Sequence, residues 1–267
     1  MTQEIQEIEE KPFAGYMPDR RAEFVPTAKW VRVYFGGELL ADSRRVMILR
    51  QVVRTPVYYF PEGDVRMELL EESDHTTHSR LTGEARYWHV RVGDRLAENA
   101  AWRYHDPSDK ASFLAGYIAF DWQKVDSVFE ESEEVYTHAR DPYHRIDVLH
   151  SSRHVKVCLD GQTLAETRSP VLLFETGLPV RYYFPKLDVR LELLEPSETH
   201  TECPYKGVAS YYSVKVGGEL KKDLIWYYPY PFSEMSKIQN LLAFFNEHVD
   251  LYVDGELQER PRTPWSI

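Results

Sequence analysis

The segment HTECPYKG at residues 200–207 combines an imidazole, a thiol, a phenol and an ammonium. A thiol acts as a nucleophile when neighbouring positive charge stabilises its thiolate, and Lys206 and His200 could supply that charge to Cys203. Lys206 could instead bind an anionic ligand or form a Schiff base. The proline and glycine of the segment also favour a compact turn, in which a cysteine is often only a small buried apolar side chain.

The spacing of Cys203 and Lys206 is that of one zinc knuckle in which a lysine replaces the second thiolate. An ammonium has no lone pair for zinc at neutral pH, and a structural zinc needs about four ligands. The other thiol, Cys158, lies in a strand-like pattern, and the histidines supply no third ligand at motif spacing. We therefore expect the protein to bind no metal and no other cofactor.

Composition excludes several classes of protein. The formal net charge is −11, which disfavours nucleic acid, because binding to phosphate backbones depends on Lys and Arg. Neither a phosphate-binding glycine motif nor a paired acidic magnesium site is present. No apolar stretch approaches the ~20 residues of a membrane span, and the first residues lack the pattern of a signal peptide. With only two cysteines, we expect a cytoplasmic protein that binds neither nucleic acid nor membranes.

The chain repeats itself at an offset of 124 residues. YYFPEGDVRMELLEES at 58–73 corresponds to YYFPKLDVRLELLEPS at 182–197, and ARYWHVRVGDRL at 85–96 corresponds to ASYYSVKVGGEL at 209–220. Nearly half of the positions between 58 and 104 are identical in the second copy, without a gap. A match of this length indicates tandem duplication of one domain.

The repeat predicts the domain boundaries. An N-terminal tail covers residues 1–27, and the first domain covers 28–130. A linker with an acidic start covers 131–154, the second domain covers 155–257, and a C-terminal tail covers 258–267.

Each copy is patterned mainly as β-strands. Segments such as VRVYFGGELLAD alternate apolar and polar residues around glycines, which is typical of β-hairpins. Apolar residues at helical spacing predict one helix per copy, at 109–122 and 233–245. The predicted fold class is therefore mainly β (α+β), with two tandem domains of antiparallel sheets and one covering helix in each.

These motifs resemble the family known as domain of unknown function 427 (DUF427). The matching residues are YYFPxxDVRxELLExS, TECPYKGVASYYSVKVGGEL and the following W-x-Y…AFF segment, and both copies match, from about residue 30 to 257. The resemblance implies a β-tent-like fold, in which two antiparallel sheets lean together at one end. Related branches hold zinc at the apex with paired Cys-x-x-Cys knuckles, and some bind small ligands in an aromatic cage. The family has also carried a nucleotidyltransferase label, which no motif of this chain supports.

Aromatic residues recur at corresponding positions of the two copies. They are Tyr59, Tyr87, Trp88, Trp102 and Tyr104 in the first copy, and Tyr183, Tyr211, Tyr212, Trp226 and Tyr228 in the second; the predicted ligand-binding set leaves out Tyr87 and Tyr211. Residues two apart on a strand share a face, so these rings could line a cleft or form an ordinary core. In the second copy, Lys206 or Arg181 would be the polar anchor of a ligand.

Three functions fit these features. The first is a small-molecule-binding module with one aromatic-lined cleft per domain, in which the second copy is the more competent. The second is an enzyme that acts on a small metabolite through Cys203 or Lys206. The third is a non-catalytic scaffold. The sequence leaves the ligand, any reaction and the oligomeric state open, a homo-oligomer included.

Overall fold

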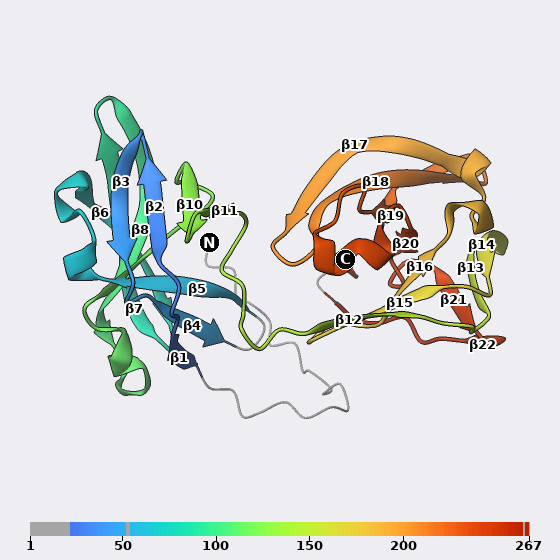
Figure 1. Ribbon diagram of the computed structural model, residues 1–267, viewed down its shortest axis with the longest axis horizontal. Helices are drawn as coiled ribbons and strands as arrows, with labels where there is room; N and C mark the ends of the chain where they lie inside the picture. Colours follow the sequence, from blue (N-terminus) through green and yellow to red (C-terminus); the bar gives the residue numbers. More distant parts are fainter. Residues whose placement is uncertain (1–21, 52–53, 264, 267) are drawn as a thin grey trace. The chain divides into compact units, whose positions relative to one another are not determined.

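The computed structural model describes residues 22–51, 54–263 and 265–266 (Figure 1). Most of the predicted N-terminal tail therefore lies outside the described residues. The chain forms two compact units that divide between Asp121 and Trp122. None of the helices in the described ranges combines the length and the apolar composition that a membrane crossing requires.

A seven-stranded antiparallel sheet forms most of the first unit. Its strands, in spatial order, are β1 (Glu23–Pro26), β4 (Met47–Gln51), β5 (Arg54–Pro61), β9 (Tyr117–Phe120), β8 (Arg95–Pro107), β7 (Gly83–Val92) and β6 (Leu70–Ser79). Two further hairpins are β2 (Val31–Phe35) with β3 (Glu38–Ser43), and, after Asp121, β10 (Ser127–Glu130) with β11 (Glu133–Val135).

The second unit contains a seven-stranded and a four-stranded antiparallel sheet. The larger sheet has the order β12 (Ile146–His150), β15 (Val171–Glu175), β16 (Arg181–Phe184), β20 (Leu242–Phe244), β19 (Glu219–Tyr227), β18 (Gly207–Val216) and β17 (Leu194–Cys203). The smaller sheet has the order β14 (Gln162–Thr167), β13 (Val155–Leu159), β21 (Asp250–Val253) and β22 (Glu256–Leu257). Figure 1 shows β17 and β18 arching over this unit, with β12 and β15 on its opposite side.

Corresponding strands of the two copies keep the same register. Tyr59 is paired with Ala119 in the first large sheet, and Tyr183 is paired with Ala243 in the second. The prediction of a mainly-β chain with two tandem domains is confirmed. Both large sheets include a strand from the segments assigned to the N-terminal tail and the linker, namely β1 and β12.

The two predicted helices are much shorter than expected. Each is reduced to a six-residue 3₁₀ helix, η3 (Asp109–Leu114) or η6 (Ser233–Ile238), and the rest of each segment includes a strand, β9 or β20. Gly116 at φ +80° and Asn240 at φ +58° reverse the chain before these strands. The apparent helical spacing of apolar residues therefore came from two separate elements. The remaining 3₁₀ helices are η1 (Glu62–Asp64), η2 (Met67–Leu69), η4 (Lys186–Asp188) and η5 (Leu191–Leu193).

The large sheet of the second unit has two different buried faces, because successive side chains of a strand alternate. Phe184 and Ile225 pack into an apolar cluster with strands of the four-stranded sheet. Their neighbours Tyr183 and Trp226 point to the other face, where η6 packs over them. We call this second surface the ring face. The first unit has a corresponding ring face, in which Tyr59 is buried beneath η3.

The turn between β17 and β18 requires glycine at position 207. Gly207 has φ +103°, and an added Cβ would lie 3.3 Å from the carbonyl oxygen of Tyr230. We expect Gly207→Ala to lower the free energy of unfolding by about 3 kcal/mol, measured by urea denaturation. The matched control is Gly217→Ala, at φ +59° with open space around the Cβ, which should lower it by only about 1 kcal/mol. Equal losses in both variants would contradict this explanation.

Candidate functional site

The segment that carries the reactive side chains is a hairpin turn. β17 ends at Cys203, β18 begins at Gly207, and the two residues are paired across the hairpin. The N–H of Lys206 donates to the carbonyl of Cys203 at 3.3 Å, which closes the turn. His200 lies on β17, and its Nδ1 is 3.2 Å from the hydroxyl oxygen of Ser210. The imidazole is thus engaged with a hydroxyl of the neighbouring strand.

The ammonium of Lys206 is buried in an ion pair. Its Nζ donates to Oε2 of Glu175 at 2.5 Å, and the two side chains are 11% and 5% exposed. The other carboxylate oxygen of Glu175 lies 2.9 Å from Nε2 of His144. Burial alone would raise the pKa of Glu175, but the hydrogen bond from His144 and the charge of Lys206 outweigh it and hold the pKa below its ordinary value. Glu175 is therefore an ionised carboxylate that joins two positively polarised partners.

Residues of the predicted linker complete this cluster. The ring of His144 stacks on Tyr205 at a centroid distance of 4.2 Å. The N–H of Asp141 donates to the hydroxyl oxygen of Tyr205 at 2.7 Å. We refer to Lys206, Glu175, His144 and Tyr205 as the charged cluster. Its linker member, His144, could not be found from the sequence, because no local motif connects residue 144 with residues 175 and 205.

The ring face lies beside the charged cluster. Nε1 of Trp226 donates to the hydroxyl oxygen of Tyr183 at 3.1 Å, and the two rings meet edge to face. Tyr183, Trp226 and Tyr228 are 1%, 8% and 4% exposed, so these predicted ligand-binding rings are packed together. Burial raises the pKa of Tyr183 and Tyr228 well above the ordinary range of a phenol, and the charges of Glu175 and Cys203 add to the rise. Glu175 follows Val171 and Leu173 at alternate positions of β15, and these two residues pack on the ring face, so its side chain lies on the same face of the sheet.

Several of these groups keep hydrogen-bond donors without an acceptor in the part of the chain that the structure describes. Lys206 donates to Glu175 alone, although an ammonium has three N–H donors. The hydroxyl of Tyr183 accepts from Trp226 but has no acceptor for its own hydrogen. The hydroxyl of Tyr228 is likewise not hydrogen-bonded within the described ranges. None of these three groups is among the buried side-chain atoms of the described residues that lack every partner, so their further donors are open to water or to a ligand.

Arg181, the other predicted anchor, lies in a different cluster. Its guanidinium forms two bonds of 2.7 Å with the carboxylate of Glu247, and both side chains are almost fully buried. It lies 5.4 Å from the centroid of the Trp226 ring. The hydroxyl of Thr263, in the predicted C-terminal tail, donates to the same carboxylate at 2.6 Å. Of the two predicted anchors, Arg181 is engaged by a bidentate ion pair and Lys206 by a single bond.

The structure does not bring Tyr212 together with the other predicted rings of the second copy. Tyr212 stacks on Tyr227 at 5.1 Å and packs against the apolar cluster of the opposite face. Its neighbour Tyr211 is the residue of β18 that packs on the ring face, and its hydroxyl lies 2.7 Å from Oγ1 of Thr201. The alternation of side chains along β18 decides which of the two tyrosines contacts Trp226.

The first copy repeats the rings without the charges. Nε1 of Trp102 donates to the hydroxyl oxygen of Tyr59 at 3.1 Å, and Tyr104 stacks on Tyr59. Trp88 is buried, with the Arg103 guanidinium 5.0 Å from its ring centroid. The positions of Glu175, Tyr205 and Lys206 are occupied by Gln51, Leu81 and Thr82. The same sheet and ring face are therefore formed in the first copy without the buried ion pair.

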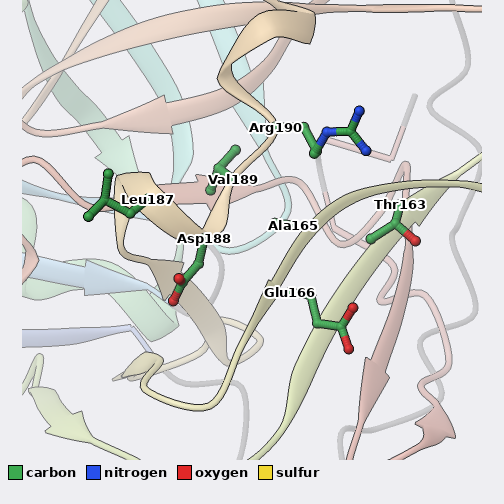
Figure 2. A pocket seen from close by; sticks show the side chains of 7 residues that line it. All are labelled: Thr163, Ala165, Glu166, Leu187, Asp188, Val189 and Arg190. Carbon is green, nitrogen blue, oxygen red and sulfur yellow. The ribbon is translucent and has the colours of Figure 1, made fainter.

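A surface groove lies at η4, on another part of the second unit (Figure 2). It has a volume of about 440 Å³ and is lined by Thr163, Ala165, Glu166, Leu187, Asp188, Val189 and Arg190. Its charged side chains already have partners: Asp188 accepts from Thr167, Glu166 from His154, and Arg190 donates to Glu192. None of its lining residues belongs to the charged cluster or the ring face. The groove is therefore a weaker candidate for a ligand site.

Within the described ranges, no three His, Cys, Asp or Glu side chains are grouped so that they could hold a metal ion. Cys203 and Cys158 are both free thiols.

Comparison with known proteins identifies one family. A family model described as a domain of unknown function (DUF427) matches residues 23–131 and, again, residues 147–255. The two matches agree with the resemblance inferred from the motifs and with a tandem copy. No curated protein sequence matches the chain significantly.

The first copy supplies a variant that tests whether the ion pair is needed for folding. The double variant Glu175→Gln/Lys206→Thr reproduces the residues of the first copy, and we call it the copy-one graft. Replacing both partners of a buried pair is often neutral or stabilising, whereas removing one leaves a buried charge that costs about 3–5 kcal/mol. We therefore expect the graft to unfold in urea with a free energy within about 1 kcal/mol of the wild type. Lys206→Met should lower the free energy of unfolding by about 3–5 kcal/mol. An equal decrease in the graft would show that the ion pair is needed for folding.

The lowered pKa of Glu175 predicts a loss of stability in acid. Because its folded pKa lies below the ordinary value of 4.5, its stabilising contribution is present above that value and is lost as the pH falls through the folded pKa. Free energies of unfolding measured between about pH 6 and pH 3 should fall more steeply in the wild type than in the copy-one graft. The same pH dependence of the free energy of unfolding in the wild type and the graft would contradict the lowered pKa of Glu175.

Proposed function

The chain belongs to the DUF427 family, whose description assigns no activity, and we propose that its second copy binds a small molecule at the charged cluster and ring face. The ligand is an acceptor-rich molecule, such as a small carboxylate with an apolar or planar body. The first copy acts mainly as a structural partner.

One observation carries this proposal: the second copy buries an ion pair that the same frame does without in the first copy. Burying Lys206 and Glu175 removes two charges from water, and their mutual attraction rarely stabilises a fold more than apolar side chains of similar size would. The first copy, with Gln51 and Thr82 at these positions, builds the same large sheet. A costly polar group that the fold does not require is typical of a functional site.

The chemistry of the donors indicates the class of ligand. Lys206, Tyr183 and Tyr228 contribute hydrogen-bond donors beside a packed aromatic face. Donors in a water-poor environment bind a carboxylate or another anionic acceptor more strongly than a neutral group. The rings favour an apolar or planar remainder of the ligand. Glu175 would position Lys206 and exclude ligands whose negative charge approaches the carboxylate.

The same geometry favours binding over covalent catalysis. Lys206 is buried in an ion pair with Glu175, so its Nζ is engaged by a carboxylate and is not presented as a free amine. Cys203 is partly exposed at the edge of the cluster, but its proposed cationic partners are engaged by Glu175 and Ser210. Two free thiols and an acidic chain suit the reducing cytoplasm, where we place this binding activity.

A thermal-shift screen with small aliphatic and aromatic carboxylates tests this function. A ligand at about 100 times its Kd adds about 2.7 kcal/mol to the stability of the protein that binds it. We expect at least one compound to raise the melting temperature of the wild type and not that of the copy-one graft. In the matched pair Tyr183→Phe and Tyr59→Phe, the first should weaken binding about 10-fold or more, since a hydrogen bond to a charged group contributes about 1.5–3 kcal/mol. The second should bind as the wild type does.

Two results would contradict the proposal. One is the absence of any shift in the wild type across the carboxylate set. The other is a shift of equal size in the wild type and the copy-one graft, which would place binding elsewhere on the chain.

A further inference from the structure

We propose that the groove at η4 is an interface through which two copies of this chain associate about a two-fold axis. In this dimer, Leu187 of each copy enters the groove of the other, and Arg190 of each copy pairs with Glu166 of the other. The dimer does not depend on the proposed function, since none of these three residues belongs to the charged cluster or the ring face.

The floor of the groove is apolar and has the same construction in both copies. A β-bridge joins Ala165 to Val189, and the two residues are 1% and 7% exposed. A corresponding bridge joins Ala41 to Val65 in the first copy. The small side chain of Ala165 leaves a hollow over this bridge, and the groove of the second copy has a volume of about 440 Å³. That volume is ample for an incoming leucine side chain.

A leucine with almost no contacts of its own stands at the edge of this hollow. Leu187 is 95% exposed, and the first copy has Gly63 at the corresponding position. Figure 2 shows Leu187 at the end of the groove that lies away from Thr163. A singly exposed leucine is ordinary on a protein surface. A leucine beside an apolar hollow, however, gives one surface both the protruding and the receiving half of a contact.

Arg190 has fewer acceptors than its counterpart in the first copy. There, Arg66 binds two carboxylates, that of Glu38 at 2.6 Å and that of Glu68 at 2.8 Å. In the second copy Gln162 takes the position of Glu38, and the guanidinium of Arg190 keeps one ion pair, through its Nε. Within the described ranges, the two Nη groups of Arg190 have no acceptor. They are therefore available to a carboxylate of another molecule.

Charges of both signs border the groove. Figure 2 shows Arg190 on one side of it, and Asp188 and Glu166 on the other. The side chains of Arg190 and Glu166 are 55% and 51% exposed. Because the chain carries a net charge of −11, two copies repel each other unless their contact surfaces pair opposite charges. A two-fold axis through the groove forms two such pairs at once, each between Arg190 and Glu166.

This self-complementarity identifies the occupant as a second copy. In a two-fold dimer the same patch serves both subunits, so it must carry both members of every contact. The groove carries the hollow with the leucine, and the carboxylate with the guanidinium. An acidic peptide would meet the repulsion of Glu166 and Asp188. The present ion pairs of Glu166 and Arg190 lie at the surface, where such pairs contribute little and exchange readily.

Sedimentation velocity of the full chain over a range of concentrations tests the dimer. We expect a reversible monomer–dimer equilibrium in the wild type. The double variant Gln162→Glu/Leu187→Gly reproduces the residues of the first copy, and we call it the groove graft. It should raise the dimer Kd about 10- to 100-fold, because it removes two leucine side chains from the interface and gives each Arg190 an acceptor within its own chain.

Leu257→Gly is the matched control for the loss of an exposed leucine. Leu257 is 58% exposed and lies on β22, at the opposite edge of the four-stranded sheet from β14. This variant should dimerise with the Kd of the wild type. An equal rise of the Kd in the control and the groove graft would overturn the assignment of the interface to the groove.

Charge reversal tests the pairing of Arg190 with Glu166. Arg190→Glu and Glu166→Arg each place like charges opposite one another twice in the dimer, so each variant alone should have a Kd at least about 10-fold above that of the wild type. An equimolar mixture of the two variants should associate about as tightly as the wild type, because both contacts then join opposite charges. Both side chains are exposed, so neither change should alter the urea unfolding curve of the monomer.

Four results would overturn the dimer as described. They are a wild type that stays monomeric up to about 1 mM, a groove graft that dimerises like the wild type, a mixture of charge variants that stays monomeric, and growth beyond a dimer. The last result would indicate a head-to-tail contact, which forms open chains and lacks the two-fold axis. None of these results decides the carboxylate screen, since the two sites share no residue.

Discussion

Successive side chains of a β-strand point to opposite faces, and this constraint organises the second unit around its seven-stranded sheet. It sends Phe184 and Ile225 into the core beneath the four-stranded sheet, and their neighbours Tyr183 and Trp226 into the ring face. A shift of one residue in any of these strands would exchange the two faces. The register of β16, β19 and β20 therefore decides which tyrosines meet the charged cluster and which only fill the core.

The charged cluster uses a face that is otherwise apolar. Lys206 and Glu175 are stabilised there because each satisfies the other, and because His144 takes the second oxygen of the carboxylate. In this buried, low-dielectric environment, a hydrogen bond between a protein donor and an acceptor group of a ligand is stronger than it would be in water. The first copy shows that the rings alone are compatible with the fold, since Trp102 and Tyr59 repeat the hydrogen bond of Trp226 and Tyr183. The two copies thus share the same large sheet and ring face, and only the second copy carries the Lys206–Glu175 ion pair.

The chain between the two repeats takes part in the site. A segment with an acidic, polar start reads from the sequence as a solvated linker, but its later residues dock on the turn between β17 and β18. The ring stack of His144 on Tyr205, the contact of His144 with Glu175 and the hydrogen bond from the Asp141 N–H tie this segment to the second unit. The end of this segment, β12, corresponds to β1 of the first copy, but the residues that dock on the turn precede the matched region, so comparison of the two repeats could not reveal their role.

The sequence by itself determined the duplication, the β-strand character, and the turn at Cys203–Gly207, because each depends on residues close together in the chain or on a direct match between copies. It misled at residues 109–122, where helical spacing arose from a 3₁₀ helix followed by a strand, since spacing cannot distinguish one element from two. Only the tertiary structure decided that Lys206 meets Glu175, that His144 joins them, and that Tyr212 lies on the other face from Trp226. These contacts depend on strand register and on the path of the linker, which are set by the packing of the whole second unit and not by any local pattern.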